Sequence, residues 1–68
     1  MNKYYRQILI IKCANYMIEY GWPVRRIAEN LCIGKSTAHN FLTIDLPQLD
    51  YEKYVQCQVI MRKHKKGR

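Results

Sequence analysis

Three breaks divide this chain into four segments, and they constrain its fold more than any other feature of the sequence. They fall at Gly21-Trp22-Pro23, at Gly34 and at Leu46-Pro47. Glycine commonly follows the end of a helix, and proline suits the first turn of one, so these breaks are typical of helix boundaries. No strand-like alternation runs over a useful length. We therefore predict that residues 1–68 form a single all-α domain of about four helices.

The outer two segments show the apolar spacing of amphipathic helices. In the first, about 3–20, apolar residues recur at intervals of three and four positions: Tyr5, Leu9, Cys13, Tyr16, Met17 and Tyr20. The last, about 51–66, is expected to pack through Tyr51, Tyr54, Val55, Val59 and either Cys57 or Met61.

The stretch before the last helix is predicted to be irregular. Residues 45–49 are expected to form a loop, because Pro47 disfavours helical geometry at Leu46. Asp50 is then a candidate N-cap for the last helix, and Glu52 lies favourably near the positive end of that helix.

The chain is strongly basic, with a net charge of +7 from 12 Lys and Arg against 5 acidic residues. Five of the basic residues crowd the last seven positions: Arg62, Lys63, Lys65, Lys66 and Arg68. Such an excess on a small domain favours a polyanionic partner. A basic end can also be only a frayed and solvated terminus, and charge alone leaves both interpretations open.

The two middle segments fit a helix-turn-helix, which we predict for Val24 to Leu42. This motif crosses two helices over a short turn that often contains glycine. The crossing needs a small side chain where the helices approach, and Ala28 provides it. Apolar anchors are expected on both sides of the turn: Ile27, Leu31, Ile33, Ala38 and Phe41.

The second helix of this motif presents polar side chains and no acidic one. They are Lys35, Ser36, Thr37, His39, Asn40 and Thr43. Asparagine can bond adenine bidentately, and Ser or Thr can bond phosphates or base edges. We therefore predict that this helix reads the major groove of duplex DNA, and that Arg25 and Arg26 hold phosphates. The alternative is an ordinary solvated helix in an αα-hairpin.

Four short motifs occupy the middle of the chain: Val24-Arg25-Arg26-Ile27-Ala28-Glu29, Lys35-Ser36-Thr37-Ala38-His39, Leu42-Thr43 and Leu46-Pro47. On these residues the chain resembles the stage III sporulation regulator D family, small helix-turn-helix transcription factors of endospore-forming bacteria. The resemblance is ungapped from Val24 through Lys65 and looser over the first helix. It implies a recognition helix that carries Lys35, Ser36, Thr37, His39 and Asn40. It also implies a second DNA contact by the last helix and its basic end, Arg62 to Arg68.

Three positions depart from the pattern of that family. Cys32 stands at a turn position that is usually glycine, so we expect a left-handed backbone there at a cost of about 1 kcal/mol. Gly34 replaces a serine before the recognition helix and is a weaker N-cap by roughly a few tenths of a kcal/mol. Phe41 occupies a position that tends to be polar in the family.

The positions of cysteine and histidine argue against disulfides and metal sites. Cys13, Cys32 and Cys57 stand alone, so we expect all three to be reduced and at least partly buried. His39 and His64 have no Cys, Asp or Glu three or four residues away, so no metal site is predicted. The sequence contains neither a Gly-rich phosphate loop nor a nucleophile motif, and we predict a non-enzyme without a cofactor.

The sequence therefore predicts a transcription regulator that binds double-stranded DNA in the cytoplasm, in association with the nucleoid. No signal peptide is visible, and the longest wholly apolar run, Ile8 to Ile11, is too short to span a membrane. Binding as a monomer or as a homodimer on two half-sites is left open. Two alternatives remain: the DNA-binding part of a recombinase, transposase or sigma-like factor, and a basic interaction module for a protein or an acidic membrane. Trp22 is predicted to plug the core rather than to stack on bases.

Overall fold

A computed structural model describes the backbone of residues 3–66 and the side chains of residues 3–63. The described chain is helical almost throughout and contains no strand, which confirms the all-α prediction. Its elements are α1 Lys3–Tyr20, α2 Val24–Leu31, α3 Lys35–Asn40, the π-helical turn η1 Phe41–Asp45, α4 Leu46–Leu49 and α5 Tyr51–Lys66. None of the described helices is long and apolar enough to cross a membrane.

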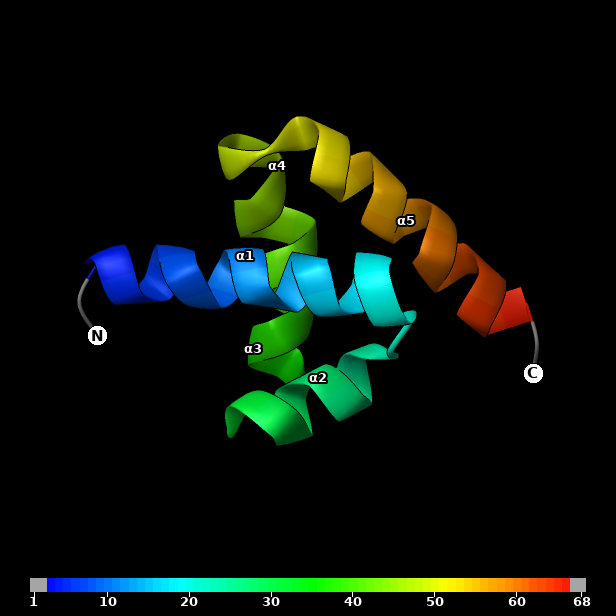
Figure 1. The fold of residues 1–68 in the computed structure, drawn as a ribbon, viewed down its shortest axis with the longest axis horizontal. Coiled ribbons are helices and arrows are strands. Elements are labelled where there is room, and N and C mark those ends of the chain that lie inside the picture. The colour runs from blue at the N-terminus through cyan, green and yellow to red at the C-terminus, as the bar shows by residue number, and fades with distance from the viewer. Residues whose placement is uncertain (1–2, 67–68) are drawn as a thin grey trace.

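Helix α1 lies across a column that α3, η1 and α4 build end to end (Figure 1). Helix α2 packs at one end of this column, and α5 begins at the other end and runs beside α1. The core lies where these elements meet and consists of Leu9, Ile10, Cys13, Ala14, Met17, Ile27, Ala28, Ala38, Phe41, Leu42, Leu46 and Cys57. Every element of the described chain therefore contributes to one core, and α1 contributes the largest share.

The buried face of α1 is the predicted one only in part, since Leu9, Cys13 and Met17 are buried as predicted. Tyr5 and Tyr20 are exposed, whereas Ile10 and Ala14 are buried. Apolar residues lie on every side of α1, including the exposed Ile8, so their spacing is compatible with more than one buried face. Packing decided between the faces, and tyrosine rings tolerate exposure because their hydroxyls remain hydrated.

Helix α5 also packs only partly through the predicted residues. Tyr51, Val55 and Val59 are exposed, Tyr54 and Met61 are half-buried, and Cys57 is fully buried. The buried face rests on the C-terminal half of α1, where Lys53 Nζ donates a hydrogen bond of 2.9 Å to Asn15 Oδ1. Of the two predicted alternatives, Cys57 is therefore the more deeply buried and Met61 the less.

The loop predicted for residues 45–49 is wrong, because α4 is helical at Leu46–Leu49. A proline inside a helix lacks an N–H group and crowds the carbonyl four residues before it. Here Pro47 follows the π turn η1 directly, and Leu46 before it adopts helical geometry, with φ −59° and ψ −43°, although proline disfavours it there. Burial of Leu46, which has no exposed surface, favours this arrangement.

The predicted N-cap of α5 is confirmed. Asp50 has an extended backbone conformation, and its Oδ1 accepts a hydrogen bond of 3.1 Å from the backbone N–H of Lys53. An N-cap side chain typically satisfies a donor of this kind in the first turn of a helix.

The cysteines divide into two groups. All three thiols are free, and Cys13 and Cys57 are buried as predicted. Burial raises the pKa of Cys13 to about 12 and that of Cys57 to about 11, so both remain neutral thiols at physiological pH. The prediction is wrong for Cys32, which is exposed because it lies at the outer side of the turn between α2 and α3.

Candidate nucleic-acid interface

The turn between α2 and α3 has the left-handed residue that the sequence predicts. Cys32 adopts φ 57° and ψ 42°, and the Ile33 N–H donates to the Ala28 carbonyl at 3.0 Å. This bond closes the C-terminal end of α2. The apolar side chains that flank the turn, Leu31 and Ile33, pack partly buried against the core. Backbone geometry and packing thus hold the two helices together at this turn.

Helix α3 begins without a side-chain cap. Gly34 precedes it with φ −68° and ψ 148°, and the Ala38 N–H donates to the Gly34 carbonyl at 3.0 Å. Gly34 lies at the N-cap position and makes no side-chain hydrogen bond, because glycine has no side-chain acceptor for the amides of the first turn.

The predicted DNA-reading side chains of α3 are exposed: Lys35, Ser36, Thr37, His39 and Asn40. Only Ala38 in this helix is buried, with no exposed surface, so one small side chain faces the core and the polar ones face outward. Four of them line a common shallow hollow: Lys35, Ser36, His39 and Asn40. Helix α3 has no acidic residue, so its outer face would not repel an approaching phosphate chain.

Thr43 differs from the other predicted contact residues. It lies on η1, it is half-buried, and its hydroxyl donates a hydrogen bond of 2.8 Å to the His39 carbonyl. The Thr43 hydroxyl proton is therefore used inside the helix. The structure brings the α3 residues to one surface but does not give Thr43 the same free donor.

Arg25 and Arg26 are both exposed at the start of α2, but their surroundings differ. Arg25 Nε lies 3.9 Å from the Glu29 carboxylate, with both side chains more than 70% exposed, so this pair contributes little to stability. The guanidinium carbon of Arg26 lies over the Trp22 ring, 4.6 Å from its centroid. Trp22 is half-buried against the core, as a plug would be, and its contact with Arg26 is one that sequence reasoning missed.

The basic end of α5 is described only in part. Arg62 and Lys63 are exposed. The helical backbone continues to Lys66, but the side chains of Lys65 and Lys66 lie outside the described residues, as does Arg68 altogether. The C-terminal end of α5 and the junction of α1 with α2 lie at the same end of the molecule's longest axis (Figure 1). The start of α2, which carries Arg25 and Arg26, and the described part of α5 that carries Arg62 and Lys63 therefore both lie toward that end.

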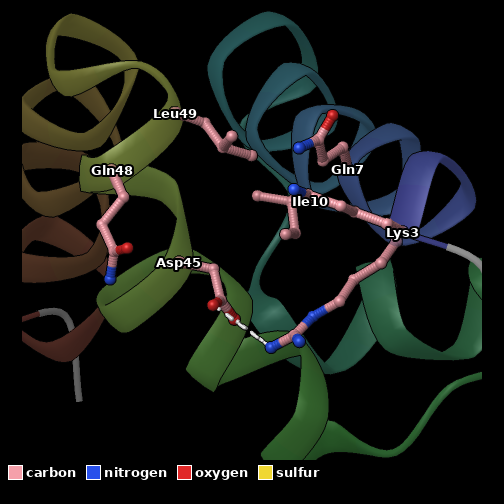
Figure 2. A pocket seen from close by; sticks show the side chains of 7 residues that line it. Lys3, Gln7, Ile10, Asp45, Gln48 and Leu49 are labelled. Atoms are coloured by element: carbon pink, nitrogen blue, oxygen red, sulfur yellow. Dashed lines mark hydrogen bonds and ion pairs between the residues drawn. The ribbon is translucent and has the colours of Figure 1, made fainter.

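An ion pair between Arg6 of α1 and Asp45 of η1 connects the two elements. Arg6 Nη2 donates to both carboxylate oxygens of Asp45, at 3.2 Å and 3.1 Å, and the guanidinium carbon lies 5.8 Å from the centroid of the Phe41 ring. The pair borders a hollow between α1 and α4 that Lys3, Gln7 and Gln48 also line (Figure 2). Sequence reasoning missed this contact, since 39 positions separate the partners and no local signal connects them.

Within the described part of the chain, no three His, Cys, Asp or Glu side chains gather closely enough to hold a metal ion. No curated protein and no solved structure matches the chain. A family model described as stage III sporulation protein D matches residues 3–68. Since this match covers nearly the whole chain and agrees with the motifs of α2 to α4, the protein belongs to the stage III sporulation protein D family of DNA-binding transcription regulators of sporulation.

Proposed function

We propose that this protein is a sequence-specific regulator that reads the major groove of duplex DNA with α3. The observation that carries the proposal is the exposed, acid-free set of side chains on α3, above the single buried Ala38. A helix with this distribution can enter the groove while α2 and η1 hold it from behind. In this proposal α2 and α3 form the helix-turn-helix of residues 24–42.

Two side chains on α3 have the chemistry for direct base readout. Asn40 can donate and accept at the same adenine edge, and His39 offers one donor and one acceptor when neutral. Lys35, Ser36 and Thr37, in the first turn of α3, are suited to phosphates and base edges at the rim of the groove. Specificity then rests on few positions, because one helix contacts few base pairs.

Phosphate contacts supply most of the affinity in this proposal. Arg25 and Arg26 lie at the start of α2, and Arg62 and Lys63 lie on the last described turns of α5. Lys65, Lys66 and Arg68 extend the same basic end in the sequence. Each phosphate that such residues neutralise releases counterions and steepens the dependence of affinity on salt.

A recognition helix alone binds too few base pairs for a stable complex, so a second contact is needed. In a monomer the basic end of α5 supplies it, and in a homodimer a second copy of the chain does so. The stoichiometry of the complex at saturating protein distinguishes the two. The protein would act on the nucleoid in the cytoplasm, where the DNA of a bacterium lies.

The proposal is tested by fluorescence anisotropy with a selected duplex and a random duplex over a series of salt concentrations. We expect the selected duplex to bind about 10³-fold more tightly or better at physiological salt. A chain ending at Met61 should show a shallower salt dependence, because it lacks the basic end. Anionic lipid vesicles serve as the control polyanion. Weak and equal binding to both duplexes, or retention on vesicles alone, would refute the proposal.

A further inference from the structure

An aromatic cluster lies at the junction of α1 and α2. The ring of Trp22 stacks on Tyr16, with centroids 5.0 Å apart and planes inclined by 22°, and it lies 5.3 Å from the ring of Tyr20. Tyr16 and Tyr20 also stack on each other, at 6.0 Å. Trp22 is therefore held between a helix and the core, and it forms a fixed platform beside the start of α2.

Arg26 uses this platform, whereas its neighbour Arg25 does not. The Arg26 guanidinium lies over the Trp22 ring, at 4.6 Å from the centroid, and among the described residues no acceptor forms a hydrogen bond or ion pair with it. A guanidinium that lies over an aromatic ring can still direct N–H donors toward a phosphate. Arg25 instead extends toward the carboxylate of Glu29, which competes with a phosphate for the same positive charge.

We propose that Trp22 is a positioning residue for DNA binding, which holds the Arg26 guanidinium ready for a DNA phosphate. The inference rests on the proposed function and adds to it the identity of the stronger phosphate contact at α2, which is Arg26 and not Arg25. Arginine has many rotamers, and fixing them on binding lowers affinity. A side chain already held over a ring loses less freedom when the phosphate arrives.

The location of the cluster agrees with this role. The junction of α1 and α2 lies at the same end of the molecule as the C-terminal end of α5, where Arg62 and Lys63 are exposed (Figure 1). A phosphate contact by Arg26 would thus extend the basic surface of α5 toward α3, since α2 joins the cluster to the turn before α3.

The first experiment compares Arg26→Met with Arg25→Met, because methionine keeps much of the apolar side chain and removes the charge. Affinity for the selected duplex is measured by anisotropy over a salt series. The plot of log K against log salt has a negative slope. We expect Arg26→Met to make this slope less steep by about 0.9, the value for one lost phosphate contact. Arg25→Met is the matched control and should change the slope by clearly less. Equal slopes for the two variants would overturn the inference.

The second experiment asks whether Trp22 acts through Arg26. Trp22→Leu should raise Kd by about two- to tenfold, the range expected when one long side chain must be immobilised on binding. The same substitution in the Arg26→Met background should leave Kd unchanged, because the side chain that it positions is already lost. A purely structural role for Trp22 predicts the same loss in both backgrounds, and that result would overturn the inference.

Trp22→Phe keeps a ring under Arg26 and should bind nearly as well as the unmodified protein. If Trp22→Leu misfolds, Trp22→Phe still tests the inference. Circular dichroism checks the helix content of both variants. If Trp22→Phe weakens binding as much as Arg26→Met does, the inference is wrong. If the unmodified chain binds no duplex selectively, the proposed function fails first. If it binds selectively and only these variants behave otherwise than expected, the positioning role alone fails.

Discussion

Two parts of one continuous helical stretch face opposite environments. The presented segment, Lys35–Asn40, buries a single alanine and directs its polar side chains to solvent. The anchored segment, Phe41–Leu49, buries Phe41, Leu42 and Leu46 against α1 and α5. The presented segment is therefore held by its packing on α2 and by its continuation into the anchored segment. Under the proposed function, stability and recognition depend on different residues of the same helical stretch, and mutations should separate them.

The largest effect is expected from truncation in the anchored segment. Leu46 has no exposed surface, so Leu46→Ala should lower the free energy of unfolding by about 2–5 kcal/mol through lost burial and a cavity. Ile44→Ala, two residues earlier and 57% exposed in the same segment, is the control and should change it by less than about 0.5 kcal/mol. Urea denaturation followed by circular dichroism measures both. Similar losses in the two variants would contradict the anchoring role.

The presented segment should show the opposite behaviour. Asn40→Ala should cost about 1–3 kcal/mol of discrimination between the selected and random duplexes, because the amide proposed to read a base is lost. Its unfolding free energy should change by less than about 0.5 kcal/mol, since the side chain is exposed. Gln48→Ala replaces an exposed polar side chain of the anchored segment and should bind DNA as the unmodified protein does. A loss of stability without a loss of discrimination in Asn40→Ala would reverse the comparison.

In the turn that leads into the presented segment, the backbone of Cys32 is strained, and a substitution can relieve that strain. Cys32→Gly should raise the unfolding free energy by about 1 kcal/mol, because glycine adopts the left-handed conformation at φ 57° without the steric penalty of a side chain. Gly21→Ala should lower the unfolding free energy by about the same amount, because Gly21 has φ +67°. An added Cβ would meet no atom within 4 Å, so backbone strain alone would cause this loss. Thermal or urea unfolding measures both changes in the unfolding free energy. A stabilising Gly21→Ala would show that backbone strain does not govern these turns.

The smallest effect is expected at the ion pair between α1 and the anchored segment. The Arg6 and Asp45 side chains are 53% and 23% exposed, so solvent weakens their attraction. A double-mutant cycle of Arg6→Met and Asp45→Asn should give a coupling of at most about 1 kcal/mol, which decreases as salt is added. Coupling well above that value would mean that the pair, rather than the buried side chains, anchors the segment.

Local features were predictable from the sequence because their causes lie within a few residues. The helix boundary at Gly21 and the N-cap Asp50 each follow from the conformational preferences of one residue and its neighbours. The left-handed Cys32 was expected instead from the resemblance to the family, in which this turn position is usually glycine. The outward face of α3 was also predictable, since only Ala38 and the apolar residues after it can face a core. The all-α class follows from the same local preferences.

Only the tertiary structure decided which faces of α1 and α5 are buried, because apolar residues occur on several sides of both helices. It also decided that residues 46–49 are helical, since burial of Leu46 and a preceding π turn outweigh the local preference of Pro47. The contacts of Arg6 with Asp45 and of Arg26 with Trp22 depend on how the elements are packed. Sequence patterns report which side chains can be buried or paired, and only packing selects among the arrangements that satisfy them.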